Sequence, residues 1–368
     1  MTRMKTKLIV LCGAIAGATP SFAQSTLTVY GVLDAAISRY QADGGASKTL
    51  MTSSANQSSR LGFRGREDLG GGIWTGFDLE AGLNNDSGLG QSTNTNNQAS
   101  GNVPAGGLTF NRKSTVGIGG SWGEFRLGRD YTPSFWNLFV YDPFRVGVGL
   151  GGITSQGSTV TVFRASNSVG YFSPGCSTPQ CKGFYGQAMY ALGENASGTA
   201  TSSDGKYLGA RLGYGGTNWG ANAATGTTNS AAAGNYLQSN LGASYDFGVI
   251  NLMFMWGTQK TGLPTAALGG GTKATHTQLG GWIPFGSDYI PVALTRMSRN
   301  DAANGKADKL AIGYVKNLSK RTAVYVTYAK INNKNGMAIA VNAGADAGPT
   351  PTVGRSASGF DFGIRHSF

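Results

Sequence analysis

The sequence predicts an all-β protein, a transmembrane antiparallel β-barrel of about sixteen strands. Stretches of about ten residues alternate between apolar and polar side chains, which is the pattern of a strand whose two faces meet different surroundings. Short turns alternate with long segments rich in Gly, Ser and Asn, as in barrels with longer loops at one end. The 368 residues include 59 Gly, 15 Tyr and 17 Phe, and only 13% of them are charged. This composition is typical of a β protein rich in glycine and aromatic residues.

The first 23 residues have the form of a secretory signal peptide. Basic residues precede an apolar run over residues 8–18, and the segment ends in Ser21, Phe22 and Ala23, a cleavage site of the small-residue kind. No later apolar run approaches the roughly 18 residues that a membrane-spanning helix needs. We therefore expect an exported chain in which residues 1–23 are removed. Residues 24–368 should form one barrel domain, because no change of composition marks a domain boundary.

Residues 59–83 show the barrel pattern most clearly. Leu61 and Phe63 point to one face of a strand, and the opposite face is cationic because successive side chains alternate. The arginines on that face are Arg60, Arg64 and Arg66. Three glycines at residues 70–72 then allow a tight turn, since glycine adopts positive φ at no steric cost. A second alternating strand follows, so the two strands are expected to form an antiparallel hairpin.

The other strands follow from the same alternation. In the first half we expect strands at residues 27–38, 109–119, 123–130 and 164–172, and long polar loops at 41–58, 84–107 and 131–163. In the second half the alternation is clearest at residues 237–247, 251–256, 309–314 and 324–328. Alternate connections are too long for hairpin turns, so the long loops are expected at one end of the barrel and the short turns at the other.

The chain ends in a strand with an aromatic face. The side chains that share this face are Phe360, Phe362, Ile364, His366 and Phe368. In hydrocarbon every backbone N–H and C=O group must be paired, so the sheet has to close and leave no open edge. We expect this last strand to close the barrel, with Phe368 at its terminus facing lipid.

Five motifs together resemble the trimeric general-diffusion porins of Gram-negative outer membranes. They are SRLGFRGREDLGGG at 59–72, the pair NRKSTVGIGG and FRLGRD within 111–130, RASNSVGYFSP at 164–174, NLSKRTAVYVTY at 317–328 and the terminal FGIRHSF. The resemblance spans the chain after the signal segment. It implies a sixteen-stranded barrel among outer-membrane lipids, a third outside loop, residues 131–163, folded into the lumen, and a homotrimer.

The resemblance also implies a set of residues at the narrowest point of the channel. It places Arg60, Arg112 and Arg164 on the barrel wall facing the inserted loop. Strand parity adds Arg64, and Arg129 is a further candidate. On the loop side we expect Asp142 and Arg145. Because cations outnumber carboxylates in this set, the expected function is passive diffusion of ions and small hydrophilic solutes with a weak preference for anions.

Other functions are less well supported by the sequence. The net charge of +12 is spread along the chain and forms no patch for nucleic acid. Only His276 and His366 could act as histidine bases, and neither lies in a readable hydrolase or metal-binding pattern, so no enzyme, cofactor or metal is expected. A substrate-specific channel or a surface adhesin-like barrel remains an alternative, since aromatic residues in the loop at 131–163 could guide a solute.

Two cysteines are expected to pair. Cys176 and Cys181 follow the predicted strand at 164–172, close together in the chain and in an oxidising compartment, which favours a disulfide. We expect this turn to lie outside the lumen, so its reduction should hardly alter conductance.

Overall fold

The computed structural model describes residues 26–145, 150–152, 161–176, 181–343 and 346–368, so the predicted signal peptide lies outside the described residues. In the described part of the chain one antiparallel sheet contains eighteen strands, of which β2 and β5 are short additions to a closed barrel of sixteen. The strands of the barrel are β1 (Thr26–Ala42), β3 (Arg60–Gly70), β4 (Ile73–Asn84), β8 (Lys113–Gly120), β9 (Gly123–Tyr131), β10 (Arg164–Phe172), β11 (Gly183–Ala191), β12 (Tyr207–Gly215), β13 (Trp219–Thr228), β14 (Tyr236–Asp246), β15 (Asn251–Thr261), β16 (Lys273–Phe285), β17 (Asp288–Arg299), β18 (Lys306–Asn317), β19 (Thr322–Lys334) and β22 (Ser356–Ser367).

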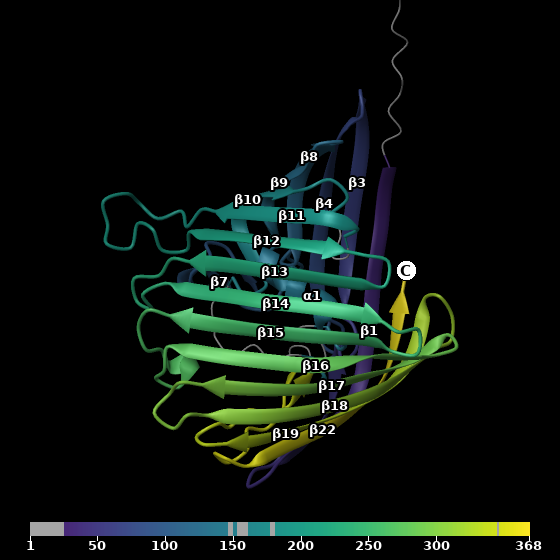
Figure 1. Cartoon of the computed structure of the whole chain (residues 1–368), viewed down its shortest axis with the longest axis vertical. Coiled ribbons are helices and arrows are strands. Elements are labelled where there is room, and N and C mark those ends of the chain that lie inside the picture. The colour runs from purple at the N-terminus through teal and green to yellow at the C-terminus, as the bar shows by residue number, and fades with distance from the viewer. Residues whose placement is uncertain (1–25, 146–149, 153–160, 177–180, 344–345) are drawn as a thin grey trace, which may run out of the picture.

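Neighbouring barrel strands follow one another in the chain, and β10 to β19 run side by side across the near wall in Figure 1. The shorter elements lie in the connections: β2 (Ser47–Ser53), β5 (Leu89–Gly90), β6 (Thr93–Asn94), η1 (Ala99–Gly101), β7 (Asn102–Val103), α1 (Pro133–Tyr141), η2 (Ala266–Leu268), β20 (Asn342–Ala343) and β21 (Asp346–Ala347). No helix among the described residues is long and apolar enough to cross a membrane.

The barrel closes between its first and last strands. β1 pairs with β22 from Val32 opposite Ser367 to Ala42 opposite Ala357, and its first half pairs with β3. Beyond the end of β22, Gly31 and Phe368 exchange two backbone hydrogen bonds, each of 3.1 Å. Every strand therefore has a neighbour on both sides, which is the condition for a sheet surrounded by hydrocarbon.

Each strand separates an apolar outer face from a polar inner face. On β1, Leu27 and Ile37 are 68% and 58% exposed on the outside, whereas Asp34 and Ser38 are fully buried on the inside. A water-soluble sheet protein would bury the apolar face instead. The exposed apolar face is therefore the lipid-facing surface, and the lumen is polar.

Besides the barrel strand β3, the short strand β2 also pairs with β1 on the side away from β22, which the sequence did not predict. The polar segment expected to be a loop at 41–58 contains β2. This strand pairs with the second half of β1, from Ala35 to Gln41, and β3 pairs with the first half, from Thr26 to Val32. Between β2 and β3 the chain leaves the wall, and the inward-facing carboxylate of Asp34 accepts the backbone N–H groups of Asn56 and Gln57 at 3.0 and 2.6 Å. This interruption brings residues 54–58 into the lumen.

The connection between β9 and β10 folds into the barrel. Pro133 at the first turn and the Thr132 side chain at the N-cap start α1, a short helix that packs on the inner wall of β12 to β15. Three side chains of the wall fix this loop by hydrogen bonds to its carbonyl groups: Asn240 to Ser134 (3.0 Å), Trp282 to Pro143 (2.7 Å) and Lys309 to Gly152 (2.7 Å).

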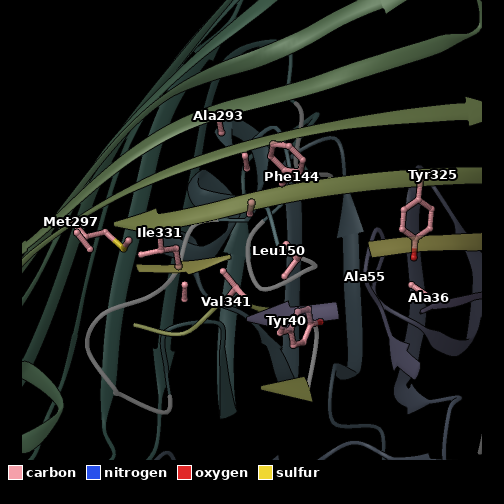
Figure 2. Close-up of a cluster of buried hydrophobic side chains, with 14 of the residues drawn as sticks. Ala36, Tyr40, Ala55, Phe144, Leu150, Ala293, Met297, Tyr325, Ile331 and Val341 are labelled. Atoms are coloured by element: carbon pink, nitrogen blue, oxygen red, sulfur yellow. The ribbon is translucent and has the colours of Figure 1, made fainter. Parts of the chain in front are cut away.

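The tip of the same loop is held by apolar contacts. Figure 2 shows Phe144 and Leu150 among buried side chains of the wall, including Met297 and Tyr325. Leu150 is fully buried and Phe144 is 9% exposed. The inserted loop is thus fastened at both its helix and its tip, and it leaves a restricted passage on the opposite side of the lumen.

Candidate functional site

The restricted passage is a cavity of about 520 Å³ between α1 and the facing wall of the barrel. Its cationic lining side chains are Arg60, Arg112, Lys113, Arg145 and Arg164, and its carboxylates are Asp78 and Glu80. Five cations against two carboxylates leave three positive charges in excess. Gln57 and Ser58, from the break between β2 and β3, also line this cavity.

Strand order explains why three arginines meet here. Arg60 begins β3, Arg112 directly precedes β8, and Arg164 begins β10. These three strands belong to one run of the wall, β3-β4-β8-β9-β10, and each starts at the long-loop end of the barrel. Residues far apart in sequence therefore reach the same level of the lumen on neighbouring strands.

Glu80 on β4 lies between two of the arginines. Its carboxylate accepts Arg112 Nε at 2.6 Å and forms an ion pair with Arg60 Nε at 3.3 Å. A second pair joins Lys113 Nζ to Asp78 at 2.9 Å. One carboxylate thus neutralises part of the charge of two arginines, so this region of the wall is less positive than a count of its arginines suggests.

Tyr131, at the end of β9, joins the cationic wall to the inserted loop. Its hydroxyl accepts hydrogen bonds from Arg112 Nη2 at 2.8 Å and Arg164 Nη2 at 3.2 Å. Its ring lies 4.6 Å from the guanidinium of Arg164 and stacks on Phe135 of α1, with centroids 4.7 Å apart. These contacts hold the Arg112 and Arg164 guanidinium groups in place without neutralising them.

Arg145 and Arg164 form no ion pair with any residue that the structure describes. The guanidinium of Arg145 lies over the Phe139 ring at 5.3 Å. Burial lowers the pKa of Arg145, yet an arginine remains protonated at any physiological pH. These two side chains therefore present the least neutralised positive charge in the cavity.

The inserted loop gives the opposite side of the cavity an aromatic character. Phe135, Trp136 and Phe139 of α1 and Phe163 just before β10 line it together with Tyr131. Phe135 contacts Phe163 edge to face at 5.7 Å, and Phe139 contacts Phe135 at 5.8 Å. The rings contact one another, so the loop side of the cavity is mainly aromatic, with Arg145 as its cation, and the facing wall carries the other four cations.

Three of the residues predicted from the sequence are placed elsewhere. Arg64 points into the lumen nearer the short-turn end, where it covers the ring of Tyr30 at 5.1 Å. Arg129 donates to the carbonyl groups of Asn111 and Asn94 at 2.6 and 2.9 Å and fastens the loop between β4 and β8. Gly128, with φ 124°, interrupts the strand alternation just before it.

Asp142 also lies away from the cavity. It is fully buried at the C-terminus of α1, where its Oδ1 accepts the Phe144 N–H at 3.0 Å. Its carboxylate therefore stabilises the turn after the helix. The acidic residues of the cavity are Asp78 and Glu80, which sequence reasoning did not single out although their parity on β4 already placed them on the face opposite Phe77 and Leu79.

The two cysteines are buried against the inner side of the barrel wall, whereas the sequence analysis expects their turn to lie outside the lumen. Cys176 and Cys181 are bonded, and their Sγ atoms lie 3.5 and 3.8 Å from Nη2 of Arg211. Arg211 on β12 is 1% exposed, and its guanidinium lies 6.0 Å from the ring of Trp136. Both sulfur atoms of the disulfide therefore contact a buried arginine that in turn adjoins Trp136 of α1.

Both histidines belong to strands of the barrel wall, His276 to β16 and His366 to β22. His276 is 6% exposed on β16, and His366 Nδ1 lies 2.9 Å from the hydroxyl of Thr322. Within the described ranges no group of three or more His, Cys, Asp or Glu residues is arranged to hold a metal ion.

Comparisons with known proteins point to one family. The family model described as Gram-negative porin matches residues 8–336. Outer membrane porin protein 32 of Delftia acidovorans is 33% identical over 379 residues, covering 99% of this chain and 100% of that protein. An outer membrane porin protein of Bordetella pertussis is 28% identical, in an alignment that covers 88% of this chain and 94% of that protein.

Solved structures show the same likeness. The anion-selective porin from Comamonas acidovorans superimposes with a TM-score of 0.77 at 31% identity, covering 94% of this chain and 100% of that one. OmpT of Vibrio cholerae superimposes with a TM-score of 0.62 at 13% identity, covering 94% and 99%, and supports the fold alone.

Proposed function

This chain belongs to the Gram-negative porin family, and we propose that its channel prefers anions because of the cationic lining of its narrowest part. As an outer-membrane porin of a Gram-negative bacterium, it lets ions and small hydrophilic solutes diffuse down their gradients. The observation that carries the anion preference is the excess of three positive charges in the cavity.

The physical basis is the field at the restriction. Charged side chains on low-dielectric walls raise the local concentration of counter-ions, and a narrow passage brings every permeating ion close to them. Salt screens such charges over about 10 Å at 0.1 M and about 3 Å at 1 M. The anion preference should therefore be strongest in dilute salt.

Three further features complete the proposal. A homotrimer is supported by the family resemblance of the sequence motifs. The family is one of channels, and we assign this chain no catalytic role. A substrate-specific channel is the second candidate, favoured by the aromatic side of the cavity.

The test is to remove two cations from the cavity by Arg60→Gln with Arg112→Gln. The excess of positive charge should fall from three to one, and the anion-to-cation permeability ratio should fall more than about fivefold, since each of the two removed charges contributes on the order of 1 kcal/mol. The measurement is the reversal potential of the purified variant in a planar bilayer under a salt gradient.

The matched control removes two arginines outside the cavity, Arg39→Gln with Arg321→Gln. Arg39 is exposed near the long-loop end of β1, and Arg321 is exposed in the turn between β18 and β19. Both variants should keep the unfolding temperature of the barrel within a few degrees. An equal shift of the reversal potential in the two variants would refute the assignment of selectivity to the cavity.

A further inference from the structure

We propose that the cavity selects small organic anions that carry a flat apolar ring, such as aromatic carboxylates, over anions without a ring. This inference rests on the proposed function and names the preferred substrate class of the same site. Its basis is the close placement of unneutralised arginines and aromatic rings in the lining of one passage.

The first step is the location of free positive charge. Glu80 forms ion pairs with Arg60 and Arg112. Arg145 and Arg164 have no carboxylate partner among the described residues. A guanidinium group offers parallel N–H donors that match the two oxygens of a carboxylate. An organic acid therefore has its best electrostatic contacts at these last two side chains.

The second step is that both arginines adjoin aromatic rings. Arg145 lies 5.3 Å from the centre of the Phe139 ring, and Arg164 lies 4.6 Å from that of Tyr131. A carboxylate bound at either guanidinium would bring whatever it carries next to these rings. A flat apolar group there gains aromatic contact and leaves water, whereas chloride gains neither.

The third step is that the rings are accessible and held in place. Phe139 and Phe163 are half-buried and line the cavity, so part of each ring meets the lumen. Behind them Phe135 and Trp136 are 6% and 9% exposed and brace them from α1. The aromatic side is therefore a fixed surface and costs little to order when a solute binds.

The size of the site agrees with this class of solute. Sites for small organic molecules typically measure about 300–1,000 Å³ and combine apolar walls with a few polar groups. The cavity of about 520 Å³ has this composition. Its contacts must stay weak, because flux requires that a solute leaves as readily as it arrives.

The experiment compares two carboxylates of equal charge as blockers of the chloride current through the full-length protein in a planar bilayer. Benzoate carries a flat ring and acetate does not. The half-blocking concentration should be on the order of tenfold lower for benzoate than for acetate. Equal half-blocking concentrations would overturn the proposal while leaving the anion-selective channel intact.

Variants locate the effect at the aromatic side. Phe139→Leu and, separately, Phe163→Leu keep an apolar side chain but remove the ring, so each should raise the half-blocking concentration of benzoate about fivefold, as expected for one lost aromatic contact. Each should change the half-blocking concentration of acetate much less, because acetate has no ring to contact. Phe184→Leu, at an outer-face residue that is 86% exposed, is the matched control and should behave as the unaltered protein.

The outcomes separate the two levels of the proposal. Preferential block by benzoate that both Leu variants leave unchanged would place ring recognition elsewhere and overturn the assignment. A channel that conducts but prefers cations would instead refute the proposed function, whatever benzoate does. If a Leu variant fails to insert, the comparison of benzoate with acetate on the unaltered protein still decides the substrate class.

Discussion

At the scale of single residues, the balance between arginines and one carboxylate sets the charge of the passage. Oε1 of Glu80 contacts Arg112 at 2.6 Å, and Oε2 contacts Arg60 at 3.3 Å and accepts the hydroxyl of Tyr30 at 3.3 Å. This carboxylate both positions the arginines and reduces their field. Its removal is therefore a sharper test of the electrostatics than the removal of any single arginine.

We expect Glu80→Gln to increase the anion preference. The substitution keeps the size of the side chain and removes one negative charge, so the excess of positive charge in the cavity rises from three to four. The anion-to-cation permeability ratio should rise a few-fold, by an amount on the order of 1 kcal/mol. The reversal potential under a KCl gradient measures it. Glu194→Gln, in an exposed loop, is the control, and a loss of anion preference in the Glu80 variant would contradict this account.

Cavity residues could be predicted where the family motifs apply, whereas strand parity alone put Arg64 on the inner face but not at the cavity. Arg60, Arg112 and Arg164 were proposed from the family motifs and line one cavity. Parity fails after Gly128, where positive φ and a shift of register between Ala165 and Ser168 turn Arg129 toward the loop between β4 and β8. Tyr131 was missed because no sequence pattern indicates that one hydroxyl will serve two arginines.

At the scale of elements, the inserted loop and the turns that support it define the passage. α1 is fixed to the wall by the hydrogen bond from Asn240, and on its other side Trp136 adjoins Arg211. Arg211 in turn contacts both sulfur atoms of the disulfide turn between β10 and β11. A connection at the short-turn end of the barrel thus supports the loop that narrows the lumen.

We expect Cys176→Ser with Cys181→Ser to change conduction. Without the disulfide Arg211 loses its contacts with the two bonded sulfur atoms, so Trp136 and α1 should move more freely. Single-channel recordings should show larger current noise and a changed mean conductance. The loss of stability should stay at about 2 kcal/mol, because the closed loop is short.

The control for this prediction applies a reducing agent to both the unaltered protein and the double Ser variant. A reducing agent should change the recordings of the unaltered protein in the same direction and leave the double Ser variant unaffected. Recordings indistinguishable between oxidised and reduced protein would support the original expectation that this turn does not influence the lumen.

Strands were predictable where lipid on one face and the aqueous lumen on the other impose an alternation of apolar and polar side chains. The hairpin of β3 and β4 was expected from residues 59–83, and its turn does contain three glycines with positive φ at 70–72. The break between β2 and β3 was not predictable, because its polar residues read as a loop. α1 was also missed, although Thr132 and Pro133 form a recognisable helix start.

At the scale of the whole molecule, closure of the barrel makes the apolar outer surface compatible with a membrane. The closing contact extends beyond the last strand, because Phe368 exchanges two backbone hydrogen bonds with Gly31. Its ring lies directly over Gly31, where no Cβ atom blocks it. These contacts agree with the predicted role of Phe368 in closing the barrel. Whether closure depends on this residue can be tested directly.

We expect deletion of Phe368 to destabilise the barrel by about 2 kcal/mol, the value of two hydrogen bonds of about 1 kcal/mol each. The measurement is the unfolding midpoint of the detergent-solubilised protein in guanidinium chloride. Phe368→Leu retains the backbone contacts and should lose less. Equal midpoints for the deletion and the unaltered protein would show that closure does not depend on the terminal residue.

The central claim is that the cationic cavity makes this outer-membrane channel prefer anions. The most direct test is the reversal potential of the purified, unaltered protein in a planar bilayer under a tenfold KCl gradient at low salt. We predict stepwise conductance with a potential of the sign set by chloride, decreasing as both solutions are made more concentrated. Stepwise conductance with a potential of the sign set by potassium would contradict the claim.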